Sequence, residues 1–444
     1  MNEVTLPFKF TPRDYQIPPM AALDAGIKRI IAVWHRRAGK EKTFINVVAK
    51  KMQERVGLYF YIFPTYAQAK KSIWDGKDRE GFPFTGHFPD ILVEKRNSTE
   101  LKITYKNGSI FQLVGSDNID SLMSTNPIGC VFAEYSLQDP AAWEFIRPIL
   151  LENGGWSIFD FTPRGKNHGF TLYNMALNNP DWFVSRLTVA DTKRPDGLPI
   201  ITEEMIESER REGVSEEMIN QEYYVSFEGV QEGSYYGKQL ALAREEGRVS
   251  RIPYDPAIGV ETWWDIGVGD STAIWFTQTI RREIRVIDYL EASGEALSYY
   301  AKELQTKPYV YSAHHGPHDL AVKEWASGGA DGRPRSRIEV AKSLGIDFQL
   351  VPNLSIDDGI NAARAIMSQC WFDETKCARG LLALSSYHKD YDTKLKMFRS
   401  YPAHDWSSHG SDSFRYFAVG HKTTVSKPPK QGGQTSSGGT WMSN

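Results

Sequence analysis

Residues 34–43 read WHRRAGKEKT, and this stretch is the strongest indication of the fold of the first half of the chain. A Gly-Lys pair follows the short apolar run 29–35 and leads into a helical pattern over 41–54. Where a strand gives way to a helix, free backbone N–H groups and the helix dipole favour a phosphate group. The usual phosphate loop, however, has a glycine five positions before the final Gly and a Ser or Thr after the Lys. Here those positions hold Trp34 and Glu41, so the stretch is a working nucleotide site, a degenerate one or a basic turn.

The rest of the first half alternates short apolar runs with helical patterns. Residues 57–63 read as a second buried strand, and a helix is expected near 66–74. Two alternating runs in 100–115 are joined by Asn-Gly, which predicts a hairpin. Further buried strands are expected at 128–134 and 156–165. Strands that alternate with helices predict a mostly parallel sheet covered by helices.

Length and composition limit the class of protein. With 444 residues, two domains are expected, each large enough to bury its own core. A formal net charge of -3 argues against a histone-like binder but leaves room for a local basic channel. Three scattered cysteines, of which Cys370 and Cys377 are too far apart for a zinc knuckle, indicate a reducing compartment. The sequence has no signal-peptide layout and no apolar run of about 20 residues, so we expect a cytoplasmic protein without a membrane span.

Several side chains around the Gly-Lys pair suit a nucleotide. The Lys40 ammonium is placed to reach the outer phosphates, and Arg36 and Arg37 add positive charge. Upstream, an aromatic ring at Tyr15 and an amide at Gln16 could stack on an adenine and hydrogen-bond its edge. This set favours ATP over a basic surface turn.

Two later strands end in residues that would lie beside the phosphate loop. Glu134 ends the apolar run 128–134, where a carboxylate can orient an attacking water. Thr162 follows the next strand, and its hydroxyl could sense the terminal phosphate. Together these residues predict ATP hydrolysis.

The second half of the chain carries a different set of acidic residues. A β-rich series from about 258 begins as an antiparallel meander, and Asp265 ends its first strand. Asp319 follows a short run, Asp412 begins a helical pattern, and Asp288 and Glu291 lie in between. Converging carboxylates can hold two Mg²⁺ or Mn²⁺ ions, one activating water and one stabilising the leaving oxygen of a phosphodiester.

The sequence resembles the large terminase subunit of tailed bacteriophages over about residues 10–422. The resemblance rests on Tyr-Gln, HRRAGK, a buried strand ending in Glu134 and Thr-Pro-Arg-Gly at 162–165, followed by the later carboxylates in the family's order. It implies an α/β fold with an N-terminal P-loop (RecA/ASCE-like) ATPase domain and a C-terminal RNase H-like nuclease domain. The expected divisions are an ATPase domain at 1–200, a helical lid or linker at 201–230, a nuclease domain at 231–422 and a disordered tail at 423–444.

The resemblance assigns roles to individual residues. Its catalytic residues are Glu134 for ATP hydrolysis, and Asp265, Asp319 and Asp412 for DNA cleavage. The nucleotide-binding residues are Tyr15, Gln16, Arg36, Arg37, Ala38, Gly39, Lys40, Glu41, Lys42, Thr43 and Thr162. The ligands for two Mg²⁺ or Mn²⁺ ions are Asp265, Glu291, Asp319 and Asp412, with Asp288 an alternative to Glu291. The ATPase would use Mg²⁺ with ATP.

Two positions depart from the family's pattern at the ATP site. Glu41 follows the lysine in place of Ser or Thr, and Ala133 precedes Glu134 in place of an Asp. Both missing groups help to hold Mg²⁺. We expect Glu41, or Thr43, to supply the oxygen ligand that Ala133 cannot.

An arginine finger that reaches a neighbouring subunit is not evident in this sequence. The family tends to place that arginine in a small-residue loop before the Glu strand, where this chain has Met123. Arg147 and Arg164 are the remaining candidates for the finger.

The expected partner is double-stranded DNA. Lys394, Lys396 and Arg399 alternate with apolar residues just before the Asp412 segment and could touch DNA phosphates, or they could form a solvated strand face. By resemblance, the chain would form a ring, expected to be a pentamer, on the portal protein, and a small terminase subunit would deliver it to DNA. A monomer in solution is compatible with this, since the portal can template assembly. It would act in the host cytoplasm and be absent from the mature virion.

Two other functions fit parts of the sequence. A DNA-repair helicase with a nuclease appendage would need a second RecA-like domain, for which 165–230 is too short. A nuclease or scaffold with a degenerate ATP site would follow from Glu41 and Ala133, but the retained Lys40 and Glu134 argue against it. His314, His315 and His318 lack a cysteine partner nearby, which favours surface or supporting roles over zinc binding.

Overall fold

The computed structural model describes residues 4–117, 124–228, 233–267, 271–321, 323–324, 335–392 and 397–425. The chain forms two compact units. The first is Met1–Ser234 with His388–Phe398 and Ala403–Trp406, and the second is Tyr235–Tyr387 with Arg399–Pro402 and Ser407–Asn444. The functional division at 1–200, 201–230 and 231–422 stays a prediction, and the expected tail lies almost entirely outside the described residues.

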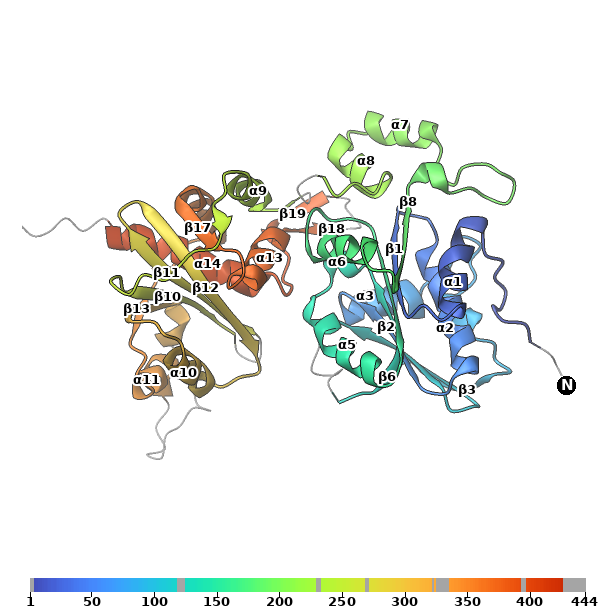
Figure 1. The fold of residues 1–444 in the computed structure, drawn as a ribbon, viewed down its shortest axis with the longest axis horizontal. Coiled ribbons are helices and arrows are strands. Elements are labelled where there is room, and N and C mark those ends of the chain that lie inside the picture. Colours follow the sequence, from blue (N-terminus) through green and yellow to red (C-terminus); the bar gives the residue numbers. More distant parts are fainter. Residues whose placement is uncertain are drawn as a thin grey trace, which may run out of the picture. The chain divides into compact units, whose positions relative to one another are not determined.

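An eight-stranded sheet forms the centre of the first unit (Figure 1). Its order across the sheet is β3 (Val93–Asn97), β4 (Lys102–Tyr105), β5 (Ile110–Gly115), β2 (Leu58–Phe63), β6 (Pro127–Ala133), β7 (Trp156–Phe161), β1 (Arg29–Trp34) and β8 (Trp182–Leu187). The strands from β5 to β8 are parallel, and only β3 and β4 run antiparallel to their neighbours. The predicted mostly parallel sheet and the hairpin at 100–115 are therefore confirmed.

Helices cover both faces of this sheet, which explains why its central strands are apolar along their whole length. On one face, α2 (Lys40–Glu54) packs into a core with residues of β1, β2 and β5. On the other face, α5 (Ala141–Glu152) and α6 (His168–Leu177) pack against β6 and β7. Other α-helices among the described residues of the unit are α1 (Ile17–Asp24), α3 (Tyr66–Ala69), α7 (Glu203–Arg211) and α8 (Glu216–Glu222).

The strand order identifies the fold class of the first unit. β7 lies between β1, which leads into the Gly-Lys turn, and β6, which leads into Glu134. One strand inserted between these two is the arrangement of P-loop domains of the RecA/ASCE-like type, as predicted. The carboxyl ends of the three strands consequently meet at one edge of the sheet, where ligands bind in α/β folds.

A seven-stranded mixed sheet forms the centre of the second unit. Its order is β16 (Phe348–Leu350), β13 (Tyr311–Gly316), β10 (Val260–Ile266), β11 (Ser271–Ile280), β12 (Glu283–Ser293), β17 (Cys370–Asp373) and β9 (Val249–Ser250). The antiparallel meander predicted from about 258 is β10–β11–β12, and β13 adds parallel to β10. A meander extended by parallel strands beside its first strand is the RNase H-like arrangement, as predicted.

The second sheet also has a helical layer on each face (Figure 1). Residues of α9 (Gly237–Glu245), α12 (Ile356–Ile366), α13 (Ala378–Ser386) and α14 (Ser408–Val425) share one core with Trp263 and Trp275. Residues of α10 (Leu297–Thr306) and α11 (Arg337–Ser343) share the other core with Trp264. Two further two-stranded sheets pair β14 (Lys323–Glu324) with β15 (Arg335–Ser336) and β18 (Lys389–Asp392) with β19 (Met397–Pro402). Within the described ranges, no helix is both long and apolar enough to cross a bilayer.

Candidate functional site

The turn between β1 and α2 is held by buried side chains. His35 is fully buried, and its Nε2 lies 2.7 Å from the Thr192 hydroxyl. Burial lowers the pKa of His35 to about 4, so the ring is neutral at pH 7. Gly39 has a φ of +83°, and a Cβ there would lie 3.0 Å from Gln16 Nε2. The left-handed backbone conformation therefore favours glycine at this position, and a Cβ would also press on the Gln16 amide.

Tyr15 and Gln16, predicted to contact adenine, fasten this turn in the structure. Tyr15 Oη donates to the Ala38 carbonyl at 2.9 Å, and Gln16 Nε2 donates to the same oxygen at 3.2 Å. Gln16 is buried, whereas Tyr15 is half-buried. Their contact with a nucleotide stays a prediction, but their hold on the loop requires no ligand.

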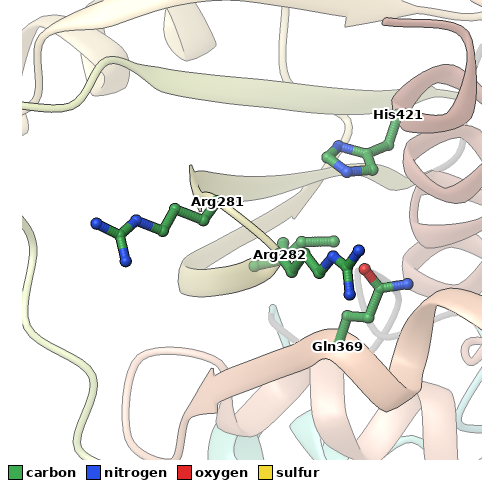
Figure 2. Close-up of a pocket in the computed structure, with 5 residues that line it drawn as sticks. Arg281, Arg282, Gln369 and His421 are labelled. Atoms are coloured by element: carbon green, nitrogen blue, oxygen red, sulfur yellow. The ribbon is translucent and has the colours of Figure 1, made fainter. Parts of the chain in front are cut away.

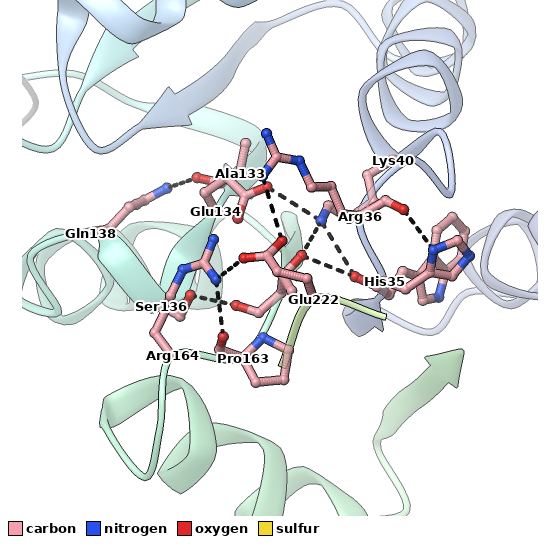
Figure 3. Close-up of polar contacts among 12 residues, drawn as sticks. His35, Arg36, Lys40, Ala133, Glu134, Ser136, Gln138, Pro163, Arg164 and Glu222 are labelled. Atoms are coloured by element: carbon pink, nitrogen blue, oxygen red, sulfur yellow. Dashed lines mark hydrogen bonds and ion pairs between the residues drawn. The ribbon is translucent and has the colours of Figure 1, made fainter. Parts of the chain in front are cut away.

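Lys40 is the first residue of α2, and its ammonium is enclosed by the ends of three strands (Figure 3). Its Nζ lies 2.9 Å from Thr162 Oγ1, 3.3 Å from Glu134 Oε1 and 3.4 Å from the Trp34 carbonyl oxygen. Burial opposes the positive charge, but the nearby carboxylates, above all Glu134, raise the pKa of Lys40 overall. The lysine is charged at neutral pH, and the structure brings together the three residues that the sequence placed beside a terminal phosphate.

Glu134 follows β6 in a left-handed backbone conformation, with a φ of 52°. Burial favours the neutral acid, yet the charges of Lys40 and Arg164 lower the pKa of Glu134 below its ordinary value. Its Oε2 is buried and makes no hydrogen bond. An ionised carboxylate with one unused oxygen can accept a hydrogen bond or a proton from water.

The predicted helical lid contacts the phosphate loop through one buried carboxylate (Figure 3). Glu222, the last residue of α8, forms a short ion pair with Arg164 and lies 3.9 Å from Arg36 Nη1. The Arg36 N–H also donates to the Glu222 carbonyl at 2.9 Å. Sequence reasoning missed this link, because Arg164 and Glu222 are 58 positions apart and nothing in the sequence between them indicates that they meet.

The two arginine-finger candidates lie in different surroundings. Arg164 is close enough to lower the pKa of Glu134, whereas Arg147 is exposed on α5. Met123, which holds the family's usual finger position, lies outside the described residues.

The other predicted nucleotide ligands surround the start of α2. Arg37 is exposed and Ala38 is buried, while Glu41 lies half-buried in the first helical turn. Thr43 is buried, and its hydroxyl donates to the Gly39 carbonyl at 2.9 Å. Lys42 pairs with Asp78 at 2.6 Å instead of facing the turn. Their roles toward a nucleotide stay predictions.

Asp265 and Glu291 belong to one row of side chains across the second sheet. Asp265 on β10 pairs with Ala273 on β11, which in turn pairs with Glu291 on β12. Residues paired across antiparallel strands point to the same face, so the two carboxylates flank a methyl group on the face that α14 covers. Glu291 is held by Arg379 at 3.2 Å and by the Tyr289 hydroxyl at 2.6 Å.

The register separates Asp288 from this row. Asp288 pairs with Phe276, whose ring belongs to the core on the α10 face. Its carboxylate binds Lys307 at 2.6 Å and the Tyr309 hydroxyl at 2.9 Å. Of the two acidic residues in β12, Glu291 therefore shares the face of Asp265.

Asp412 and Asp319 complete the predicted acidic set. Asp412, in the second turn of α14, accepts from Tyr387 Oη and pairs with Arg415, both at 3.2 Å. Burial, then the charge of Asp265, raise the pKa of Asp412 to about 6, although Arg415 acts against them. The pKa of Asp265 is also raised, mainly by burial, and the charge of Asp319 contributes. The carboxylates are thus close enough to repel one another, and a cation would relieve this repulsion.

The chemistry of these carboxylates suits metal ions, but their present positions do not bring them together around one ion. Carboxylate oxygens are the ligands that Mg²⁺ and Mn²⁺ prefer. As placed, however, no three acidic, His or Cys side chains of the described residues converge closely enough to hold an ion. Asp265 is engaged by His409, whose Nδ1 lies 3.6 Å from its carboxylate. Sequence reasoning missed His409 and Arg415, which occupy these carboxylates.

The three histidines of β13 and the following turn differ in environment. His315 is buried and stacks on Trp263 with ring centroids 3.8 Å apart, and burial lowers its pKa to about 4. His314 Nδ1 lies 2.7 Å from the Thr262 hydroxyl, whereas His318 is exposed. His315 is thus a neutral, buried residue and not a surface one, and a supporting role for it stays a prediction.

Cationic side chains gather elsewhere in the second unit. A cavity of about 480 Å³ is lined by Arg281, Arg282, Ile284, Gln369 and His421 (Figure 2). It lies at the β11–β12 turn, at the other end of β11 from Ala273, and contains none of the predicted site residues. Of the predicted DNA contacts, Arg399 is exposed on β19 beside Tyr401, and Lys394 and Lys396 lie outside the described residues.

Similarity to known proteins extends over most of the chain. No family model matches the chain. The chain is 24% identical over 417 residues to the large terminase subunit of Escherichia phage T5, covering 91% of this chain and 90% of that protein. The solved large terminase of a thermophilic bacteriophage covers 91% of this chain and 98% of its own, at 15% identity and a TM-score of 0.40. The ATPase domain of the Thermus phage P74-26 large terminase covers 49% and 94%, at 20% identity and a TM-score of 0.40. The chain is thus similar in sequence, over most of its length, to a phage large terminase subunit, which is the resemblance that the sequence motifs indicated.

Replacing Glu134 by Gln tests its role in ATP hydrolysis. The substitution keeps size and removes the group that can accept a proton, so we expect hydrolysis to fall about 10²–10⁴-fold. Nucleotide affinity, measured by fluorescence titration, should change only a few-fold. Glu144→Gln, on the exposed face of α5, is the matched control and should hydrolyse like the wild type. Equal hydrolysis by Glu134→Gln and wild type would contradict this role.

The raised pKa of Asp412 predicts a pH dependence of stability in metal-free protein. Between its ordinary value of 3.8 and about 6, the folded chain keeps a proton that the unfolded chain has lost. The free energy of unfolding should therefore fall as pH rises through this window and then level off. Asp412→Asn should remove this component, as measured by urea unfolding in EDTA, while Asp347→Asn, at an exposed site, should not. The same pH slope for Asp412→Asn and wild type would show that burial does not hold this proton.

Proposed function

We propose that the chain is the motor and DNA-cutting subunit of phage genome packaging. Residues 1–200 would hydrolyse ATP to translocate double-stranded DNA into the prohead, and residues 231–422 would act as an endonuclease on concatemeric DNA. The observation that carries the proposal is the Lys40–Glu134–Thr162 cluster at the edge of a RecA/ASCE-like sheet. The acidic row of the second unit and the T5 relative, which spans both units, support it.

The side chains of the first unit suit phosphoryl transfer from ATP. Phosphate oxygens would compete with Glu134 and Thr162 for the charged Lys40 ammonium, because all three are acceptors for it. Release from Lys40 would free both oxygens of Glu134 to orient the attacking water. Arg164, held by Glu222, would supply positive charge near the same carboxylate. Mg²⁺ bound with ATP would neutralise the developing charge on the phosphates.

The side chains of the second unit suit hydrolysis of a phosphodiester. Asp265, Glu291, Asp319 and Asp412 would hold two Mg²⁺ or Mn²⁺ ions, which activate water and stabilise the leaving oxygen. Arg379, His409 and Arg415 keep three of these carboxylates in place without metal. Each would have to yield its carboxylate when DNA and metal bind. DNA phosphates would be met by Lys394, Lys396 and Arg399.

The proposed setting follows from the relationship to large terminases. The subunit would assemble into a ring, expected to be a pentamer, on the portal protein, with a small terminase subunit as the link to DNA. It would work in the host cytoplasm and leave before the virion is complete. Arg147, which is exposed, would be a candidate for the finger that reaches a neighbouring subunit in such a ring.

The alternatives receive less support. A repair helicase needs two RecA-like sheets, whereas the two large sheets within the described ranges are one RecA/ASCE-like and one RNase H-like. For a nuclease with a degenerate ATP site, the pair of Lys40 with Glu134 would be a structural ion pair only, and the measurement of ATP hydrolysis decides between the two.

Paired variants separate the two activities. Lys40→Ala should abolish Mg²⁺-dependent ATP hydrolysis and leave plasmid cleavage with Mn²⁺ or Mg²⁺ unchanged, whereas Asp265→Ala should do the reverse. Each variant serves as the folding control of the other. If the wild type hydrolyses no ATP, even with DNA, portal and small subunit present, the motor function is refuted and the degenerate-site alternative holds.

A further inference from the structure

The ATP site lacks two oxygen ligands that a P-loop ATPase uses for its divalent cation. Ala133 stands on β6 immediately before Glu134, and Glu41 follows Lys40. The hydroxyl of Thr43, two residues further on, donates its proton to the Gly39 carbonyl and keeps its lone pairs. The carboxylate that usually precedes the glutamate of β6 is therefore the cation ligand for which this chain needs a substitute.

Asp160 on β7 lies beside the position that Ala133 leaves without a carboxylate. The parallel register pairs Asp160 with Ala133 on β6 and with Ala32 on β1. Neighbouring strands are about 4.8 Å apart, so the three side chains form one row on one face. Ile158, two residues earlier in β7, packs in the core that contains α2, which places this row on the α2 side of the sheet. Two methyl groups as neighbours leave room around the carboxylate.

Asp160 is buried without a well-aligned hydrogen-bond partner. Its exposed fraction is 0%, and neither carboxylate oxygen has a well-aligned hydrogen bond, although the Glu134 backbone N–H lies near enough to act against the rise of its pKa. Burial raises the pKa of Asp160, the charge of Lys40 lowers it, and the charges of Glu41 and Glu134 raise it again. A carboxylate in this position is costly to the folded chain unless water or an ion satisfies it.

Other unsatisfied oxygens surround the same place. Glu134 Oε2 and Tyr61 Oη are both buried without a partner. Burial, then the charges of Asp160, Glu41 and Glu134, raise the pKa of Tyr61, so these groups lie within electrostatic reach of one another. Lys40 is the cation among them, and a phosphate would draw its charge away from the carboxylates. Negative charge would then remain in a buried, oxygen-lined place next to the phosphates.

We propose that Asp160 replaces the aspartate missing from β6 and holds the divalent cation of the bound nucleotide, directly or through water. The carboxylate has moved one strand across the sheet, and alanine at 133 leaves the space that this requires. The inference rests on the proposed ATPase function and specifies which residue of this chain makes it dependent on Mg²⁺.

The test measures metal uptake, which a purely structural role would not change. Full-length protein is titrated with Mn²⁺ by electron paramagnetic resonance with and without saturating ADP. The Mn²⁺ ion bound only in the presence of ADP reports this site, separately from the carboxylates of the second unit. Asp160→Asn should weaken that ion about 10–100-fold while ADP binding in EDTA stays within a few-fold of wild type. Glu144→Gln, on the exposed face of α5, is the matched control and should retain the ion, whereas Glu41→Gln tests the competing carboxylate.

A paired substitution guards against a folding defect. Asp160→Ala should lose the ADP-dependent ion, and Ala133→Asp combined with Asp160→Ala should recover it, since the swap conserves volume across the row. Metal-free Asp160→Asn should melt no lower than the wild type, because burial already disfavours the charged form of Asp160 and asparagine keeps the size of the side chain. Equal uptake by Asp160→Asn and wild type, or loss in Glu41→Gln alone, would overturn the role of Asp160 and leave the ATPase proposal standing. Absence of ADP binding by the wild type would refute both.

Discussion

A buried ammonium group, Lys40, is the constraint around which the first unit is arranged. Removing an amino group from water is costly, and the cost is met only where oxygens converge on it. Here the oxygens come from the ends of β1, β6 and β7, which are separate in sequence and adjacent in the sheet. The strand order and the left-handed backbone at Gly39 bring these oxygens together. The hydrogen bonds from Tyr15 and Gln16 to the Ala38 carbonyl hold the loop in place. The oxygens around Lys40 hold its ammonium in position before any ligand binds. A phosphate, which is a more strongly charged acceptor, would therefore meet a donor that is already in place.

The second unit follows the opposite electrostatic pattern. Its buried charges are carboxylates, and they are held apart from one another by Arg379, His409 and Arg415. The row from Asp265 through Ala273 resembles the row at Asp160 in one respect, since a small neighbour leaves space for a carboxylate on a covered sheet face. In both units, buried acidic groups lie next to cationic side chains. A metal ion can replace the cationic side chain beside a carboxylate, and a phosphate can replace the carboxylate beside a lysine.

The sequence predicted the elements and the strand-end residues well, because apolar runs and turn residues are local signals. Lys40, Glu134 and Thr162 could be placed together since the carboxyl ends of parallel strands share an edge. Asp160 escaped notice because it lies inside an apolar strand, where its importance depends on alanines from two other strands. The Arg164–Glu222 pair and the choice of Glu291 over Asp288 likewise depend on long-range contacts and register, which composition and periodicity do not encode.

The most direct test of the account is to locate nucleotide binding by hydrogen exchange and mass spectrometry. Addition of ADP and Mg²⁺ to the wild type should slow amide exchange in residues 35–43, and at the strand ends 133–136 and 160–164, where the oxygens around Lys40 originate. Exchange in 260–266 of the second unit should stay the same. Unchanged exchange across 35–43, or protection confined to 235–387, would contradict the conclusion that WHRRAGKEKT is a working phosphate loop.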